Sequence, residues 1–318
     1  MDLPAPAAPS TRFIRPLAAG SAASGALAAG GAASGVGFGG MRRPLAQTSI
    51  RDALDSAVIA LTAAGCDTPR LDAELLLAAA MGVDRAVILS DPGRGIEPDA
   101  ARRFMDHAAR RRAREPVAYI LGRRGFRTIE LEVDPRVLIP RPETEHLVEA
   151  LLDLPEGARV CDVGTGSGAI ALALKVERPD FEVVATDAIA EALEVARANA
   201  RRLGLEVAFH HGDLLADVAG PLDAVVSNPP YVEDGAELEP DIVRYEPALA
   251  LRSGPDGLDV IRRLLPAAGA TAARTVALEI GAGQAAAVAE LIRESGFPAV
   301  ETIADLAGID RVLVGRRP

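Results

Sequence analysis

The segment from Ser227 to Tyr231 is the part of the chain whose residue types most strongly predict chemistry. It places Asn-Pro-Pro-Tyr directly after an apolar run. Two successive prolines fix the backbone and lack N–H donors, which leaves carbonyl oxygens free to accept hydrogen bonds. The side-chain carbonyl of Asn228 and the backbone carbonyl of Pro229 can both accept from one planar –NH2 group, while Pro230 keeps the turn rigid and Tyr231 lies against a flat substrate. The ordinary alternative is a Pro-Pro turn with no chemical role.

Methyl transfer to an amide or an exocyclic amine is the chemistry that suits this pair of acceptors. The lone pair of such a nitrogen is delocalised, so the nitrogen is a poor nucleophile. Two acceptors can hold it in line with a methyl donor and stabilise the positive charge that develops on it. A sulfonium donor brings its own leaving group, so this chemistry needs neither a metal nor a strong base.

A glycine-rich loop supplies a second candidate site. Gly164, Thr165, Gly166, Ser167 and Gly168 follow an apolar strand pattern and precede a helical one. Glycines allow the backbone to turn sharply and to approach a ligand closely at a helix N-terminus. The loop also fits a dinucleotide fingerprint, so by itself it does not separate NAD from S-adenosylmethionine.

Two carboxylates follow the next strands of the pattern. Asp187 closes the second strand, 19 residues after Gly168, where it could accept both hydroxyls of an adenosine ribose. Its structural alternative is to cap the helix that starts near Ile189. Asp213 follows the third strand and could accept the adenine amino group, although a role within a Gly-Asp turn is about equally expected.

The elements that must position these residues alternate between strand and helix from residue 143 onward. This alternation is typical of a parallel sheet with helices on both faces. We predict strands at Arg159–Val163, Glu182–Thr186, Glu206–His210, Asp223–Ser227, Thr275–Ile280, Ala299–Ile303 and Arg311–Val314. The predicted helices are Glu143–Leu152, Ala169–Val176, Glu191–Leu203, Leu258–Leu265 and Gln284–Ser295. The fold class is therefore α/β, a seven-stranded doubly wound, Rossmann-like sheet whose ligand site lies at the carboxyl ends of the strands.

The part of the chain before this sheet has a helical period. Helices are predicted from Thr48 or Ser49, after Pro69, and from Pro98 to about Arg114. The pattern then changes to an alternating strand over Phe126–Val133, followed by an Asp-Pro turn. We therefore predict an extension over 1–44, a small all-helical domain over 45–118, a β-hairpin linker over 119–139 and the sheet domain over 140–318.

Composition limits the class of protein further. Residues 1–40 are mostly Ala, Gly, Pro and Ser, which predicts disorder or a start codon assigned too early, with Met41 as the alternative start. A secretory signal or a transit peptide is the weaker alternative, because the run lacks a strong apolar segment. The chain has two cysteines and four histidines without metal-ligand spacing, so we expect no metal. Its net charge of −11 argues against an indiscriminate polyanion binder. The absence of a long apolar window predicts no membrane span, and we expect a cytoplasmic protein.

Nine arginines crowd into residues 102–127 and are opposed there by only two carboxylates. They are Arg102, Arg103, Arg110, Arg111, Arg112, Arg114, Arg123, Arg124 and Arg127. One interpretation is a solvated helix face followed by an exposed hairpin. The other is a docking surface for an acidic partner, with charge reversal at Arg110–Arg112 as its test.

Beyond these motifs, residues 48–318 resemble the release-factor glutamine methyltransferases, the PrmC/HemK family. The resemblance is carried by Glu115–Gly122, Leu138–Glu145, Asp162–Gly168, Asn228–Tyr231, Tyr245–Leu251, Gly254, Asp256–Leu258, Leu278–Gly281, Gln284, Asp305–Gly308 and Asp310–Arg311. The runs Pro140–Glu145 and Tyr245–Leu251 are its most specific part. The first forty residues have no counterpart in the family.

The resemblance implies N5-methylation of the glutamine in the GGQ motif of peptide chain release factors, with S-adenosyl-L-methionine as cofactor. By position, Gly164–Gly168 and Asp187 would hold the cofactor, Leu214 would flank the adenine beside Asp213, and Asn228–Tyr231 would hold the glutamine amide. Asn228 would also adjoin the cofactor. Some members carry an aromatic residue near the position of Leu214. We expect a monomer whose partner is the release factor, with no stable nucleic-acid binding.

Three other functions are compatible with parts of the pattern. An N-methyltransferase for DNA adenine or RNA guanine would use the same tetrapeptide, but the chain has no recognisable target-recognition domain. An NAD-dependent oxidoreductase would use the same glycine loop, but would leave Asn228–Tyr231 unexplained. A non-catalytic S-adenosylmethionine-binding protein would not need the intact tetrapeptide.

Overall fold

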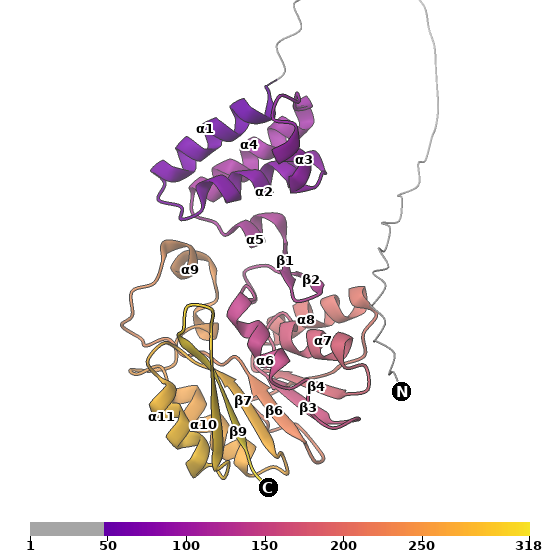
Figure 1. Ribbon diagram of the computed structural model, residues 1–318, viewed down its shortest axis with the longest axis vertical. Coiled ribbons are helices and arrows are strands. Elements are labelled where there is room, and N and C mark those ends of the chain that lie inside the picture. Colours follow the sequence, from indigo (N-terminus) through magenta and orange to yellow (C-terminus); the bar gives the residue numbers. More distant parts are fainter. Residues whose placement is uncertain (1–47) are drawn as a thin grey trace, which may run out of the picture. The chain divides into compact units, whose positions relative to one another are not determined.

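The computed structural model describes residues 48–318, whose elements are labelled in Figure 1. The extension predicted over residues 1–44 lies outside the described residues. Five helices come first: α1 (Ile50–Ala63), α2 (Pro69–Met81), α3 (Arg85–Ser90), α4 (Pro98–Arg112) and α5 (Val117–Leu121). The Ser49 hydroxyl caps α1 by accepting from the backbone N–H of Asp52 at 3.2 Å. The predicted helices correspond to α1, α2 and α4, whereas α3 and α5 are too short to produce a clear period.

The chain then forms the β-hairpin expected between the helical domain and the sheet, although the strand predicted over Phe126–Val133 is divided between its two strands. Strands β1 (Arg123–Phe126) and β2 (Ile129–Glu132) pair antiparallel. The turn breaks the apolar alternation in two, and Arg127 adopts a φ of +49° there. Phe126 and Leu131 are buried and anchor the hairpin in the core of the following domain.

A seven-stranded sheet forms the rest of the molecule. Its strands are β3 (Arg159–Val163), β4 (Glu182–Asp187), β5 (Ala208–His211), β6 (Ala224–Ser227), β7 (Thr275–Glu279), β8 (Ala299–Ala304) and β9 (Asp310–Arg316). Their order is β5-β4-β3-β6-β7-β9-β8. The expectation of a parallel sheet holds for β3 to β7, but β9 runs antiparallel to both of its neighbours. A short turn joins β8 to β9, which makes a hairpin at the end of the sheet in place of a crossover helix.

Helices cover both faces of the sheet. The helical segments after β2 are η1 (Pro142–Thr144), α6 (Glu145–Glu149), α7 (Ala169–Glu177), α8 (Ala190–Leu203), α9 (Pro240–Tyr245), η2 (Ala248–Ala250), α10 (Asp259–Gly269) and α11 (Ala285–Glu294). Of these, α7 and α8 pack on one face of the sheet and α10 and α11 on the other. The helix expected over Glu143–Leu152 is shorter than predicted, and α9 and η2 were not predicted. Within residues 48–318, no helix is long and apolar enough to cross a membrane.

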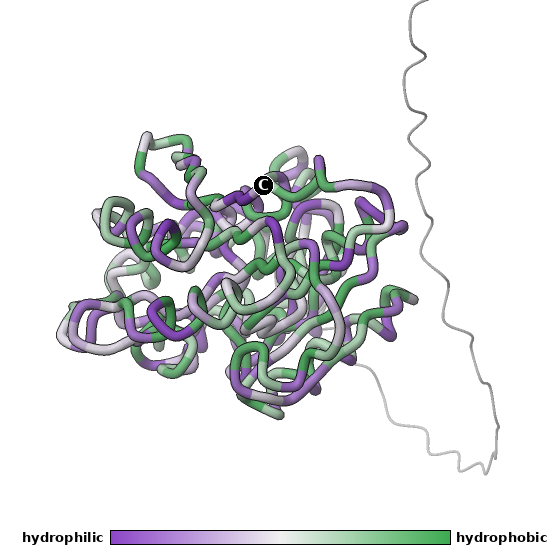
Figure 2. The backbone as a smooth tube through the Cα atoms, turned by 90° about the horizontal axis from the view of Figure 1, so that it is seen from below, coloured by the Kyte–Doolittle hydropathy of each residue, from purple (hydrophilic) through white to green (hydrophobic). Residues whose placement is uncertain are grey.

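Alternate residues of the strands supply two separate cores. Val160 and Val226 pack with α7 and α8 on one face, whereas Cys161 and Val225 pack with α10 and α11 on the other. Burial raises the pKa of the Cys161 thiol to about 12, as expected for an inert core residue. Figure 2 shows apolar and polar segments alternating along the backbone, the pattern of elements that bury one side only.

Candidate active site

A cavity of about 530 Å³ opens at the carboxyl ends of β3, β4 and β6. It gathers most of the residues that the sequence singles out, because the strands that carry them are adjacent and parallel. The residues of those motifs that line the cavity are Gly164, Thr165, Gly166, Ser167, Asp187, Asp213, Leu214, Asn228, Pro229 and Pro230. Gly168 lies just behind the loop, and Tyr231 lies beside the cavity without being part of its lining.

The glycine loop has the backbone conformation that its sequence requires. Gly164, Gly166 and Gly168 adopt φ values of +73°, +56° and +85°, a region that side chains disfavour. A Cβ on Gly164 or Gly166 would meet nothing within 4 Å, so both residues border open space. A Cβ on Gly168 would lie 2.9 Å from Cδ1 of Leu172, so this glycine lets α7 begin close to the strand.

Two buried carboxylates lie at this loop. Asp187 Oδ2 accepts from the backbone N–H of Gly166 at 2.9 Å, and its Oδ1 accepts from that of Ile189 at 2.9 Å. Asp162 Oδ2 accepts from the Thr165 hydroxyl at 2.7 Å. Burial raises the pKa of Asp187, and it raises that of Asp162 to about 7.

Asp162 Oδ1 is the one buried side-chain polar atom of residues 48–318 that lacks a hydrogen-bond partner. A buried carboxylate without a full set of partners favours a cation nearby. Asp187 thus binds the N–H of Ile189, the residue before α8, and also lines the cavity, so a structural role and a ligand contact are compatible.

After the carboxyl end of β5, Asp213 and Leu214 both line the cavity. The Asp213 side chain is 61% exposed and forms an ion pair with Arg263. Its neighbour Leu214 lines the cavity with a φ of +54°, and its carbonyl accepts from the Thr186 hydroxyl at 2.8 Å. This strand end therefore offers the cavity an apolar side chain, Leu214, beside the partly exposed carboxylate of Asp213.

Three side chains from other parts of the sequence form hydrogen bonds with the tetrapeptide Asn228–Tyr231. Asn228 Nδ2 donates to the Thr144 hydroxyl at 3.1 Å, and the Tyr231 hydroxyl donates to Glu279 at 3.0 Å. Gln284 Nε2 donates to the Tyr231 carbonyl at 3.0 Å. At Gly257, a Cβ would lie 2.1 Å from that carbonyl oxygen, so only glycine fits beside it.

Two acceptors in the tetrapeptide remain available. Neither Asn228 Oδ1 nor the Pro229 carbonyl accepts a hydrogen bond from any residue in the range 48–318, and both residues line the cavity. This is the arrangement needed to receive a planar –NH2 group. Thr144, Glu279 and Gln284 were not proposed as site residues from the sequence, although they lie within or beside motifs that carry the family resemblance.

The arginine cluster divides into buried, half-buried and exposed members. Arg111 and Arg114 are buried and bind Asp241 of α9, and Arg111 also binds Asp72 at 2.7 Å. Arg110 pairs with Glu115 at 2.5 Å. The burial of Arg111 fits neither the solvated helix face nor the docking surface predicted from the sequence, whereas Arg112 is exposed and a docking role there stays a prediction.

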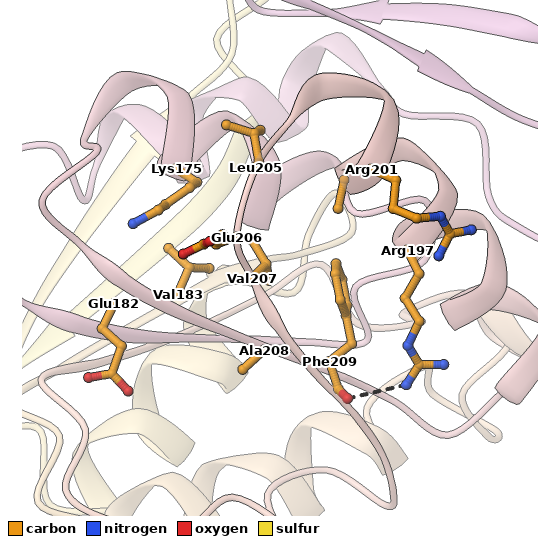
Figure 3. A pocket seen from close by; sticks show the side chains of 11 residues that line it. Lys175, Glu182, Val183, Arg197, Arg201, Leu205, Glu206, Val207, Ala208 and Phe209 are labelled. Carbon is orange, nitrogen blue, oxygen red and sulfur yellow. Dashed lines mark hydrogen bonds between the residues drawn. The ribbon is translucent and has the colours of Figure 1, made fainter.

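A second hollow lies at the edge of the sheet, between β5 and the helices α7 and α8 (Figure 3). Three of its charged residues, Lys175, Glu182 and Arg197, have partners within the described part of the chain. Lys175 donates to the carbonyls of Pro179 and Phe181, and Arg197 donates to that of Phe209 at 3.2 Å. Across the described part of the chain, no group of His, Cys, Asp and Glu side chains could hold a metal ion.

A sheet of this order with an antiparallel β9, a glycine loop after β3 and Asn-Pro-Pro-Tyr after β6 defines an S-adenosylmethionine-dependent methyltransferase. Two family profiles match the chain: the PrmC N-terminal domain over residues 52–122 and the methyltransferase small domain over residues 142–254.

Curated relatives extend this match over most of the chain. The release factor glutamine methyltransferase of Deinococcus radiodurans is 43% identical over 275 residues, which covers 84% of this chain and 98% of that protein. The protein of the same name from Neisseria gonorrhoeae is 46% identical over 257 residues, which covers 78% and 93%. A solved release-factor-specific protein-(glutamine-N5) methyltransferase from Alicyclobacillus acidocaldarius is 36% identical over 59% of this chain and 99% of that one, with a TM-score of 0.36. The chain belongs to the release factor glutamine methyltransferase family.

Proposed function

We propose that this protein transfers a methyl group from S-adenosyl-L-methionine to the side-chain amide nitrogen of the glutamine in the GGQ motif of peptide chain release factors. The observation that carries the proposal is the pair of unused acceptors, Asn228 Oδ1 and the Pro229 carbonyl, at a cavity bordered by the glycine loop. An amide –NH2 offers two N–H donors in one plane, which matches two acceptors on one short segment. Family membership supports the same substrate.

The cofactor fits the other half of the cavity. Gly164 and Gly166 border open space, so the backbone can approach the ligand closely. Asp187 would accept from the ribose hydroxyls, and Leu214 would contact the adenine ring. The sulfonium and ammonium groups of the cofactor complement the carboxylates of Asp162 and Asp187. S-adenosyl-L-methionine, when bound, supplies an electrophilic methyl carbon attached to sulfur.

The chain's own residues orient the nucleophile. Asn228 Oδ1 and the Pro229 carbonyl each accept one N–H of the glutamine amide, and the Tyr231 ring lies against the amide plane. The amide nitrogen held in this way would bond to the methyl carbon that the cofactor supplies, with the carbon–sulfur bonding electrons left on sulfur, and one N–H proton would pass to solvent. As positive charge develops on nitrogen, both hydrogen bonds strengthen, which lowers the barrier selectively.

The helical domain of residues 45–118 is, in this proposal, the part that docks the release factor, and residues 119–139 link it to the methyltransferase domain of residues 140–318. We infer that the enzyme acts as a monomer in the cytoplasm. Its net charge of −11 supports the absence of stable nucleic-acid binding.

Mass spectrometry of a purified release factor tests the proposal. After incubation with this protein and S-adenosyl-L-methionine, the GGQ peptide is expected to gain about 14 Da, the mass of one CH2 that methylation adds. Asn228→Ala should lower the rate by roughly 100-fold or more, because one of two charge-stabilising acceptors is lost, while cofactor affinity stays within a few-fold. Methyl transfer to DNA adenine or RNA guanine, with none to the release factor, would overturn the proposal in favour of a nucleic-acid methyltransferase.

A further inference from the structure

A chain of hydrogen bonds joins both ends of the catalytic tetrapeptide through two residues from elsewhere in the fold. Asn228 Nδ2 donates to Thr144 Oγ1 at 3.1 Å, and the Thr144 hydroxyl donates to Glu279 Oε2 at 2.5 Å. The other carboxylate oxygen of Glu279 accepts from the Tyr231 hydroxyl at 3.0 Å. Thr144 lies in η1 and Glu279 ends β7, 135 residues apart in the sequence.

The carboxylate of Glu279 determines which group donates and which accepts in each of these hydrogen bonds. An ionised carboxylate can only accept, so the single hydroxyl proton of Thr144 must point toward it. The Thr144 oxygen then has only lone pairs left for Asn228. Asn228 must therefore turn its –NH2 end toward Thr144 and its Oδ1 away from it.

Burial prevents water from replacing these partners. Glu279 is 1% exposed and Thr144 is 3% exposed. In such a site a hydrogen bond that is lost is not regained from solvent, so the orientation is well defined.

We propose that Glu279, acting through Thr144, is a positioning residue that fixes the orientation of the Asn228 amide and so presents Oδ1, rather than –NH2, to the substrate. Through the Tyr231 hydroxyl the same carboxylate holds the tyrosine on the other side of the substrate position. This proposal rests on the proposed function, because it requires a substrate that donates N–H groups. An inverted Asn228 would point its own donors at the donors of the glutamine amide.

Two substitutions, each by a residue of nearly the same size as the original, test the hydrogen bonds among Asn228, Thr144 and Glu279. Thr144→Val removes the hydroxyl and keeps the shape, and Glu279→Gln allows the side chain at 279 to donate to Thr144 and so reverses the chain. Both are expected to lower kcat for release-factor methylation by roughly 10- to 100-fold, the usual cost of removing a group that orients a site residue. KM for the release factor and the cofactor Kd, measured by calorimetry, should change by no more than a few-fold.

Thr144→Ser and Thr275→Val are the matched controls. Serine restores the hydroxyl, so Thr144→Ser should recover most of the rate. Thr275→Val makes the same replacement at a buried threonine at the other end of β7 and should leave the rate unchanged. Equal losses in kcat and melting temperature for Thr144→Val and Thr275→Val would assign Thr144 a purely structural role and overturn the proposal.

The pH profile separates positioning from packing. Burial raises the pKa of Glu279, and the nearby Glu143 raises it further. The hydrogen bonds from Thr144 and Tyr231 and the charge of Arg311 lower this pKa in part. Once protonated, Glu279 can donate to Thr144, so kcat of the wild type should fall as the pH drops through this raised pKa. Glu279→Gln should lack that acid limb; the same acid limb in the variant would contradict the proposal.

A readout that needs no turnover distinguishes failure of this proposal from failure of the proposed function. In 15N-labelled protein, the side-chain amide protons of Asn228 should exchange slowly in the wild type and faster in Thr144→Val. Slow exchange with no release-factor methylation would refute the proposed function but leave the orientation correct. Methylation with equally fast exchange and equal kcat in both proteins would refute the positioning role alone.

Discussion

At the scale of single residues, the site relies on carboxylates that are buried with few partners. Asp162 is fully buried beneath the glycine loop, and its pKa is raised to about 7 by that burial. The folded protein therefore holds this proton more tightly than the unfolded chain, where the ordinary pKa of 3.8 applies. The stability that this proton contributes is complete below the unfolded value and is lost as the pH rises through about 7.

Asp162→Asn should remove this pH dependence. Between about pH 5.5 and pH 8, the free energy of unfolding of the wild type should fall by roughly 2 kcal/mol relative to that of the variant. Urea unfolding of the cofactor-free proteins measures the difference. Asp153→Asn, at an exposed position, should give a profile parallel to the wild type; a parallel profile for Asp162→Asn as well would show that the buried carboxyl is ionised throughout.

The sequence identifies site residues that lie in short continuous motifs. It misses those that only the fold brings together. The glycine loop and the Asn-Pro-Pro-Tyr segment are recognisable because each is a few consecutive residues with unusual backbone requirements. Thr144 and Glu279 are ordinary residues whose roles come from each other across 135 positions. Asp213 lines the cavity as its position suggests, and the sequence did not indicate its ion pair with Arg263 of α10; its contact with the adenine stays a prediction.

At the scale of elements, the strands were predictable because their apolar runs end at glycines, prolines or carboxylates. The predicted bounds of β3 agree with the structure, and those of the other strands differ by only a few residues. Helix α9 gives no such signal, since it has six residues and its Val243 is 58% exposed. Its position is set by Asp241, which binds Arg111 of α4 at 2.5 Å, 130 residues away.

The contact between α4 and α9 should be essential for stability. The Arg111 side chain is 7% exposed and lies between Asp72 and Asp241. Arg111→Met would leave the buried Asp72 without its cation and Asp241 with Arg114 alone, so we expect a loss of about 3–5 kcal/mol in the free energy of unfolding. Arg112→Met, at the exposed neighbouring position, should change it by less than about 0.5 kcal/mol. Urea titration of both variants checks this, and equal effects would mean that the buried cation is replaceable.

At the scale of the whole molecule, the cofactor should stabilise the fold through mass action. At a concentration of S-adenosyl-L-methionine 100 times its Kd, the free energy of unfolding should rise by about 2.7 kcal/mol. NAD shares the adenosine but brings a second ribose and a pyrophosphate, so it should give no comparable shift. A thermal-shift comparison of the two ligands measures this. A larger shift with NAD would contradict the assignment of the cavity.

The position of Asp241 also limits how this enzyme can be recombined with its relatives. This carboxylate follows the catalytic tetrapeptide by only ten residues, yet its ion pairs are with two arginines near the end of the helical domain. A chimaera that exchanges the helical domain alone would separate the acid from the bases that evolved beside it. The natural unit of exchange is therefore discontinuous: the helical domain together with the α9 segment, transplanted as a pair.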